Sequence, residues 1–230
     1  MTYNITPVAI AHSPYGEKFA TPRQPGLVAS AQGKIELLAP FNQADAVKGL
    51  ELCSHIWLEF VFHQCIDQGW KSKVRPPRLG GNQKIGVFAT RSTHRPNGLG
   101  LSVVKLDKIE ASDNGVVLWV SGLDLIDGTP VIDIKPYIPY SDALPDAQYS
   151  IAQDAPPHVP VFFSDKSTQQ LTGKPQLRQF IEETLSQDPK PAFHKIDPER
   201  VYGALLMDHN VTWRYTYNTD NQVQIEVLSL

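Results

Sequence analysis

Proline and glycine interrupt this chain so often that few stretches remain for a long helix. The 230 residues include 19 prolines and 15 glycines. Proline removes a backbone donor and glycine favours turns, so this punctuation favours short strands joined by turns. Hydrophobic residues make up 41% of the chain, which is enough for one large core or two modest ones. This composition excludes a disordered or fibrous chain.

Most of the predicted strands lie in the first 140 residues. They combine β-branched or aromatic residues with alternating polarity, and they span residues 4–10, 34–38, 55–65, 84–90, 101–109, 116–121 and 129–137. A short helix is predicted over 42–50, and Asp113-Asn114-Gly115 is a hairpin signal. Because strands and helices do not alternate regularly, we expect a closed or nearly closed barrel rather than a doubly wound sheet.

A second, smaller unit is predicted beyond a proline-rich connector. Six prolines lie between Pro136 and Pro160. Residues 175–186 have helical spacing, 201–207 read as a strand, and 211–227 alternate as a hairpin. The expected fold is therefore mainly β. It has a single β-barrel N-terminal domain over 1–145, followed over 146–230 by the connector and a small α+β C-terminal domain.

The net charge of −3 hides an uneven distribution. No acidic residue lies between Asp67 and Asp107, and this window holds eight of the 21 basic residues: Lys71, Lys73, Arg75, Arg78, Lys84, Arg91, Arg95 and Lys105. An even spread would place roughly four there. Because the window also contains loop signals, it predicts an anion-binding surface. A solvated basic face without a partner is the alternative that stays open.

Two segments carry groups suited to chemistry. Residues 91–102 place Arg91, His94 and Arg95 on a loop stiffened by proline and glycine, and a guanidinium binds a carboxylate or phosphate with two hydrogen bonds. In 129–137, alternation places Asp133, Lys135 and Tyr137 on one face, with Ile132, Ile134, Pro136 and Ile138 on the other. From spacing alone, a functional face and a surface ion pair are equally good readings of this strand.

Several other site types are not expected. Cys53, His55, His63 and Cys65 are zinc-ligand residue types. On one extended strand, however, the two cysteines would lie roughly 40 Å apart, so no metal is expected. Gly98-Leu99-Gly100 lacks the rest of a Rossmann fingerprint. No apolar run is long enough to span a bilayer and no secretory signal is apparent, so we expect a cytoplasmic protein without a membrane partner.

Several motifs occur together along the chain: Ser13-Pro14, Lys18 to Gly26, Ser54 to Trp57, Ala89 to Asn97, Gly100 to Ser102 and Asp127 to Tyr137. In combination they resemble the TsaA-like family, also called YaeB or TrmO. The Trp213-Arg214 hairpin is similar to the small extra domain of bacterial members, so the resemblance covers nearly the whole chain. Gly98-Leu99 departs from the family, which often has Pro-Ile or a similar pair there.

The resemblance implies an S-adenosylmethionine-dependent tRNA methyltransferase built on a β-barrel. It implies methylation of N6 of threonylcarbamoyladenosine at position 37, next to the anticodon of threonine tRNA. It also implies a homodimer with the cofactor near the subunit interface. Two alternatives stay open: a non-catalytic RNA-binding β-barrel, and a methyltransferase or hydrolase acting on a small anionic metabolite.

For an enzyme of this kind we expect three groups of site residues. Cofactor contacts are expected from Pro22, Arg23, Gln24, His63, Gln64, Arg91, His94, Leu101, Asp124, Leu125 and Asp127. Contacts to tRNA are expected from Lys71, Lys73, Arg75, Arg78 and Arg95. The N6 nitrogen is a poor nucleophile until its proton leaves, so a base is useful. Asp133 is the first candidate, with Lys135 orienting it or the carbonyl oxygen and Tyr137 as a second candidate.

Overall fold

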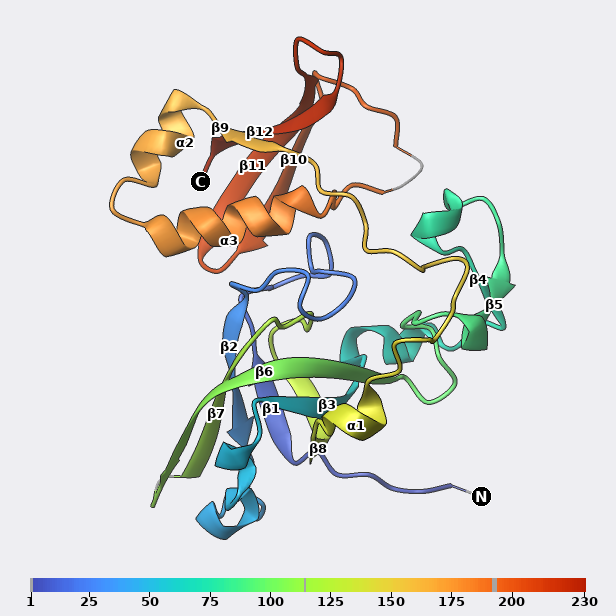
Figure 1. The fold of residues 1–230 in the computed structure, drawn as a ribbon, viewed down its shortest axis with the longest axis vertical. Coiled ribbons are helices and arrows are strands. Elements are labelled where there is room, and N and C mark those ends of the chain that lie inside the picture. Colours follow the sequence, from blue (N-terminus) through green and yellow to red (C-terminus); the bar gives the residue numbers. More distant parts are fainter. Residues whose placement is uncertain (1, 114, 192–193) are drawn as a thin grey trace.

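Six strands close a β-barrel in the computed structural model, which describes residues 2–113, 115–191 and 194–230 (Figure 1). Their order around the barrel is β1-β2-β7-β6-β3-β8, and every pair is antiparallel. The strands are β1 (Ala9–His12), β2 (Gln32–Leu37), β3 (His55–Val61), β6 (Leu99–Ser112), β7 (Gly115–Ser121) and β8 (Thr129–Pro136). The predicted mainly β fold with a barrel is confirmed.

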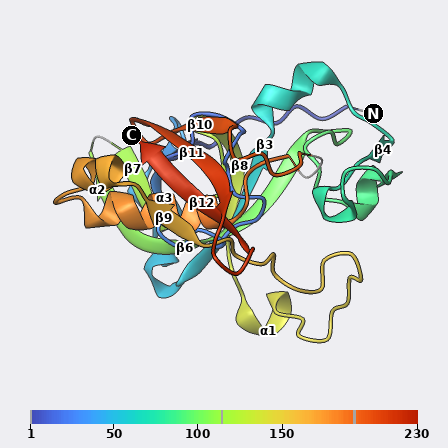
Figure 2. The same cartoon turned by 90° about the horizontal axis from the view of Figure 1, so that it is seen from above.

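A second sheet lies at one end of the barrel (Figures 1 and 2). Its order is β10-β11-β12-β9, where β9 (Val161–Phe163) runs parallel to β12 (Val223–Ser229) and the other pairs are antiparallel. The other two strands are β10 (Val201–Leu206) and β11 (His209–Tyr217). Two helices accompany this sheet, α2 (Asp165–Gln170) and α3 (Pro175–Ser186). The observed α3 matches the predicted helix residue for residue.

Each sheet has its own apolar core. The barrel core includes Ile35, Ile56, Leu58 and Leu118, each fully buried. The second core forms between α3 and the four-stranded sheet, and it includes Phe180, Trp213 and Tyr215. It also contains residues of the segment that joins β1 to β2: Tyr15, Ala20, Val28 and Ala31. This N-terminal segment therefore packs into the core of the C-terminal unit.

Three strand predictions need correction. The strand predicted over 84–90 is only β5 (Ile85–Gly86), paired with β4 (Lys73–Val74) and followed by the 3₁₀ turn η5 (Val87–Ala89). The strand predicted over 55–65 ends at Val61. Phe62 N–H donates to the Gly98 carbonyl (2.7 Å), and the 3₁₀ turn η3 (His63–Gln68) begins at the next residue. The first strand begins at Ala9 rather than at residue 4.

The remaining short elements are turns. The helix predicted over 42–50 is two 3₁₀ turns, η1 (Ala44–Val47) and η2 (Leu50–Leu52), separated by Gly49 at φ 91°. A further turn is η4 (Pro77–Leu79), and α1 (Pro139–Asp142) is a single helical turn after β8. In the predicted hairpin, β6 and β7 pair Ser112 with Gly115, while Asn114 lies outside the described residues.

A β-bulge interrupts β8. Its register against β3 shifts between Glu59, opposite Asp133, and Phe60, opposite Val131. The extra residue, Ile132, breaks the predicted alternation, so Val131 is buried and Ile134 packs against the barrel core. Asp133 and Lys135 consequently stay about half exposed on the outer wall.

Gly33 provides a test of the barrel packing. A Cβ atom at this position of β2 would lie 2.2 Å from the His12 carbonyl oxygen and 2.5 Å from Leu123 Cδ1. Backbone cannot move aside cheaply, so Gly33→Ala should lower the free energy of unfolding by about 1–3 kcal/mol. The measurement is chemical denaturation. Gly86→Ala is the control, because nothing lies within 4 Å of its added Cβ. Equal stability of the two variants would contradict this packing.

Candidate functional site

Loops from distant parts of the chain meet at the barrel end that faces the C-terminal sheet. Ser13 Oγ donates to the Leu125 carbonyl (2.5 Å), and Ser13 N–H donates to Asp127 Oδ1 (3.0 Å). Asp127 N–H donates in turn to the Tyr15 carbonyl (2.8 Å). These bonds fix the loop between β7 and β8 against the segment that follows β1. They hold the predicted residues Asp124, Leu125 and Asp127 in one place.

Arg91 joins a second pair of distant segments. Its guanidinium donates to Gln24 Oε1, and the Gln24 amide donates to the Arg23 carbonyl. Arg23 Nη2 reaches the Asp188 carbonyl at 3.5 Å, while Pro22 is buried. The structure therefore places Arg91 against Gln24, although the two residues are 67 positions apart in the sequence.

The Asp124 carboxyl group is the most perturbed acid of this region. Burial raises its pKa to about 6, and the Ser102 hydroxyl and the Arg91 charge only partly offset that effect. Its Oδ1 atom is buried without a hydrogen-bond partner among the described residues. A buried carboxylate oxygen without a donor is costly. Asp124 therefore suits a ligand that carries a cationic N–H donor.

His94 stands on the same loop as Arg91. Burial, helped by the positive charges of Lys71 and Lys18, holds its pKa below the usual range. The ring is therefore neutral near pH 7. Its Nδ1 atom is buried and has no hydrogen-bond partner among the described residues. A neutral imidazole of this kind can accept or donate one further hydrogen bond.

The other predicted cofactor residues lie apart from these contacts. His63 and Gln64 begin η3, not a strand end as expected, and Gln64 is exposed. Leu101 lies on the outer face of β6 opposite Glu59 of β3, and 51% of it is exposed. The structure thus gathers Gln24, Arg91 and the Asp124 loop more tightly than it gathers His63, Gln64 and Leu101.

The three predicted catalytic residues lie on the outer wall of the barrel. Lys135 Nζ donates to Glu59 Oε1 (2.7 Å) and to Asp133 Oδ2, and these two carboxylates raise the lysine pKa. The Tyr137 ring lies 5.8 Å from the Trp57 ring. The hydrogen bonds of Asp133 and Lys135 run to Glu59 and to backbone, not to Asp124 or Arg91.

The predicted nucleic-acid residues fall into two kinds. Lys71, Lys73 and Arg75 are exposed on or beside the β4–β5 arm, which projects beyond the barrel (Figure 1). Arg78 donates to the Asp154 carbonyl of the connector (2.7 Å). Arg95 donates to the Thr90 carbonyl (2.6 Å) and shapes its own loop. Arg95 therefore has a structural role that its sequence position did not predict.

Sequence reasoning missed several residues that organise the site. Ser13 and Tyr15 hold the Asp124 loop, and Ser102 lies against the Asp124 carboxyl group. The Ser13–Pro14 motif by itself does not indicate this role. Its partner Leu125 lies 112 residues away, so no local pattern could have revealed this contact.

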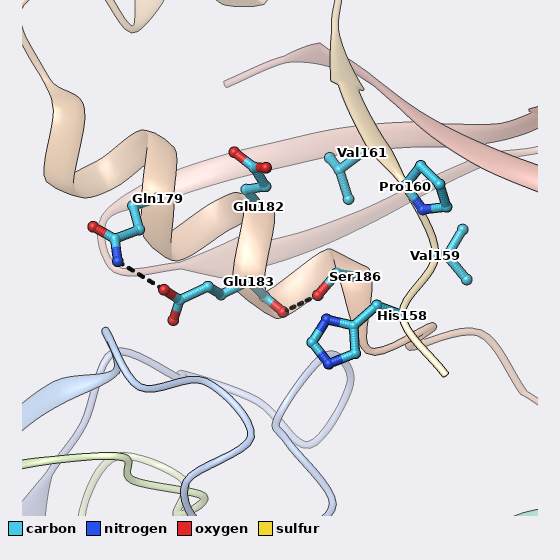
Figure 3. A pocket seen from close by; sticks show the side chains of 8 residues that line it. All are labelled: His158, Val159, Pro160, Val161, Gln179, Glu182, Glu183 and Ser186. Carbon is cyan, nitrogen blue, oxygen red and sulfur yellow. Dashed lines mark hydrogen bonds between the residues drawn. The ribbon is translucent and has the colours of Figure 1, made fainter. Parts of the chain in front are cut away.

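One hollow of the C-terminal unit lies away from these residues. It has a volume of about 400 Å³ between α3 and β9, and it is lined by His158, Val159, Pro160, Val161, Gln179, Glu182, Glu183 and Ser186 (Figure 3). Glu183 is already occupied, because it accepts from Gln179 Nε2 and from Ser30 N–H and Oγ. None of the predicted site residues lines this hollow.

Two family models and several known proteins match this chain along most of its length. The family model "tRNA-methyltransferase O N-terminal domain" matches residues 10–143, and the "TrmO C-terminal domain" model matches 156–229. The chain is 51% identical to the Escherichia coli K12 protein named tRNA (adenine(37)-N6)-methyltransferase, covering 94% of each chain. It is also 51% identical to a Pseudomonas aeruginosa protein named a putative S-adenosylmethionine-dependent methyltransferase, again over 94% of each.

Solved structures agree with this match. A chain from a crystal structure of TrmO superposes with a TM-score of 0.81 and 45% identity, covering 100% of this chain and 99% of the other. A TrmO crystal structure from Pseudomonas aeruginosa gives the same TM-score at 43% identity. Both the barrel and the C-terminal sheet therefore have counterparts in solved structures. No helix in the described part of the chain is long and apolar enough to cross a membrane.

Asp124 predicts a measurable pH effect on stability. Its pKa rises from 3.8 in the reference state to about 6 in the folded protein. The folded state therefore holds this proton more tightly, and stability falls as the pH rises from about 4 to 6. Asp124→Asn does not ionise, so it should be more stable than the parent at pH 7.5, by up to about 3 kcal/mol.

Chemical denaturation at pH 7.5 and pH 4 checks this expectation. The gain of Asp124→Asn should vanish at pH 4, where the parent carboxyl group is protonated. Asp45→Asn, at an exposed carboxyl group on η1, is the control and should show no such difference. An Asp124→Asn protein no more stable than the parent at pH 7.5 would mean that this carboxylate is not penalised by burial.

Proposed function

The chain belongs to the TrmO family, and from this membership we propose that it methylates N6 of threonylcarbamoyladenosine at tRNA position 37. The reaction class is that of an S-adenosylmethionine-dependent tRNA (adenine(37)-N6)-methyltransferase. The observation that carries the proposal is the match to an enzyme of that name over 94% of both chains. The threonylcarbamoyl group and threonine tRNA are the proposed finer specificity.

The residues at the barrel end fit S-adenosylmethionine. The buried Asp124 Oδ1, which lacks a donor, suits the ammonium group of the cofactor. The Arg91 guanidinium, held by Gln24, suits its carboxylate. Leu125, Asp127, Pro22, Arg23 and His94 complete the proposed pocket, with His63, Gln64 and Leu101 at its edge. When bound, the cofactor supplies an electrophilic methyl group.

The chain's own part in the reaction is mainly to position the two reactants and to remove a proton from N6. The N6 lone pair is delocalised into the urea carbonyl, so this nitrogen attacks only as its proton leaves. We assign the removal of that proton to Asp133, which acts as the general base. Its carboxylate is exposed and is held by Lys135. Lys135 orients Asp133, and Tyr137 remains the second candidate base. Methyl transfer to nitrogen is an in-line displacement, so alignment of the two reactants accounts for much of the rate.

A homodimer is part of the proposal. Exposed apolar side chains support it: Leu101 of β6, 51% exposed, and Ile138 between β8 and α1, 39% exposed. Because the proposed base is on the outer wall and the proposed cofactor residues are at the barrel end, a second chain could complete the site near the interface. Light scattering of the purified protein measures its oligomeric state.

We also propose a cytoplasmic location, where tRNA is modified.

One experiment tests the reaction directly. Purified protein is incubated with S-adenosylmethionine and tRNA from a strain that lacks this gene, and the nucleosides are read by mass spectrometry. We expect a gain of one methyl group on threonylcarbamoyladenosine. No gain with cofactor bound would indicate another acceptor. No gain and no cofactor binding would indicate an RNA-binding barrel without catalysis.

Asp133→Asn should lower kcat by about 10²–10⁴-fold, because a general base contributes that much. Cofactor affinity, measured by calorimetry, should stay unchanged. Glu59→Gln is a matched control, since Glu59 is the other carboxylate bound to Lys135 and carries the same charge. It should retain kcat within a few-fold. If the two variants lose activity equally, the ion-pair network matters and Asp133 is not the base.

Arg75 and Arg78 should contribute to the salt dependence of tRNA binding. Replacing both by Ala removes two cationic groups, so the slope of log Kd against log salt should become shallower by about 1 to 2. Filter binding over a salt series measures the slope. Replacement of Lys48 and Lys108 by Ala is the control, because these two exposed lysines lie outside the β4–β5 arm, directly after η1 and on β6. An unchanged slope in the arginine variant would assign this arm another role.

A further inference from the structure

Phe88 presents an aromatic ring to solvent in the middle of the basic window. It is 77% exposed, while the exposed phenylalanines Phe41 and Phe162 reach 38% and 53%. Leaving a phenylalanine ring in water forgoes about 1.5–3 kcal/mol of burial energy. Chance exposure of one large apolar residue is ordinary, so the surroundings of the ring must carry the argument.

The ring is held by a rigid turn. Phe88 is the central residue of η5, and its neighbour Val87 is 2% exposed. Thr90 closes the turn, because its N–H and Oγ1 both donate to the Val87 carbonyl (3.1 and 2.8 Å). Tyr149 OH donates to the Ala89 carbonyl from the connector. The backbone on both sides of Phe88 is therefore fixed, and little conformational entropy remains to be lost on binding.

The surroundings of the ring are cationic. The Arg95 guanidinium lies 5.9 Å from the ring centroid and is anchored on the Thr90 carbonyl. The neighbouring segment is attached through Val87 N–H to the Ser72 carbonyl (3.0 Å), and it carries Lys71 and Trp70, of which Trp70 is 56% exposed. No acidic residue lies between Asp67 and Asp107. A partner for this surface therefore carries negative charge and planar rings.

Single-stranded RNA has both properties. Its phosphates are anionic, and its unpaired bases stack on aromatic side chains and arginine planes. The turn also leads directly to the proposed cofactor contact, because Arg91 follows Phe88 by three residues and binds Gln24. We propose that the Phe88 ring is a stacking platform for an unpaired base of the tRNA anticodon loop. The proposal rests on the proposed function.

Substitution of Phe88 separates stacking from simple apolar contact. Phe88→Ala should weaken binding of an anticodon stem-loop RNA by about fivefold to a hundredfold. Phe88→Tyr keeps a ring and should retain the affinity of the parent, whereas Phe88→Leu keeps apolar bulk and should lose it. Phe162→Ala on β9 is the matched control for removal of an exposed ring. Fluorescence anisotropy of a labelled stem-loop measures the affinities, and calorimetry checks that cofactor affinity is unchanged.

Abasic nucleotides identify the stacked base. Each unpaired base of the stem-loop is removed in turn. At one position its removal should weaken binding to the parent protein but cause no further loss with Phe88→Ala. Independent losses at every position would overturn the proposal.

The remaining outcomes are also decisive. Equal affinity of Phe88→Ala and the parent overturns the proposal, as does full rescue by Phe88→Leu. A change of oligomeric state in Phe88→Ala would assign the ring to an interface between copies instead. The binding assay needs no catalysis. If the parent transfers no methyl group but the abasic pattern appears, the proposed reaction fails and the stacking platform stands.

Discussion

Closure of the barrel by β1 and β8 is the constraint on which the site depends. Ala9 pairs with Val131 and Ala11 with Thr129, and Val8 N–H extends the closure by donating to the Val131 carbonyl (2.8 Å). These pairs join segments about 120 residues apart, so they are entropically expensive to form and set the register of everything beyond them. With that register fixed, Ser13 meets Leu125 and Tyr15 meets Asp127. The Asp124 loop then has one position, beside Ser102 and the Arg91 charge.

The same segment attaches the C-terminal unit. Tyr15 pairs with Leu206 as an isolated bridge, Met207 N–H donates to the Pro14 carbonyl, and Ser30 binds Glu183 of α3. Tyr15 itself is buried 5.5 Å from the Phe180 ring. The residues after β1 therefore contact the Asp124 loop on one side and the C-terminal core on the other. The C-terminal unit therefore helps to hold the loops at the barrel end in place, whether or not it also binds tRNA.

The barrel end carries a carboxyl group that lowers the stability of the free protein. Asp124 has a buried oxygen without a donor, and its pKa is raised to about 6. A free protein with such a group is less stable than it need be near neutral pH. A cationic ligand group beside Asp124 would remove that penalty. The free energy gained in this way would then strengthen binding of the ligand. By contrast, the Lys135–Glu59–Asp133 network is half exposed and contributes little to stability.

Local patterns in the sequence determined most of the elements. Turn signals and alternation located β7, β8, β11, β12 and α3, because hydrogen bonding and periodicity act over a few residues. They failed at 84–90 and at 63–65, where apolar residues resemble a strand but Phe62 and Val87 bond to distant carbonyls instead. The bulge at Ile132 was likewise invisible, since it depends on the register against β3. The motifs of residues 89–97 and 127–137 identified the family.

Only the tertiary structure decided how those motifs combine. The sequence named Gln24, Arg91 and Asp124 as site residues, but it contained nothing to say that Arg91 bonds to Gln24 or that Asp124 is buried without a donor. The sequence also could not distinguish Arg95, which holds its own loop, from Arg75, which is exposed. Charge and residue type are local properties that a sequence states outright. Burial and pairing depend on contacts between segments that lie far apart in the sequence, so only the folded chain determines them.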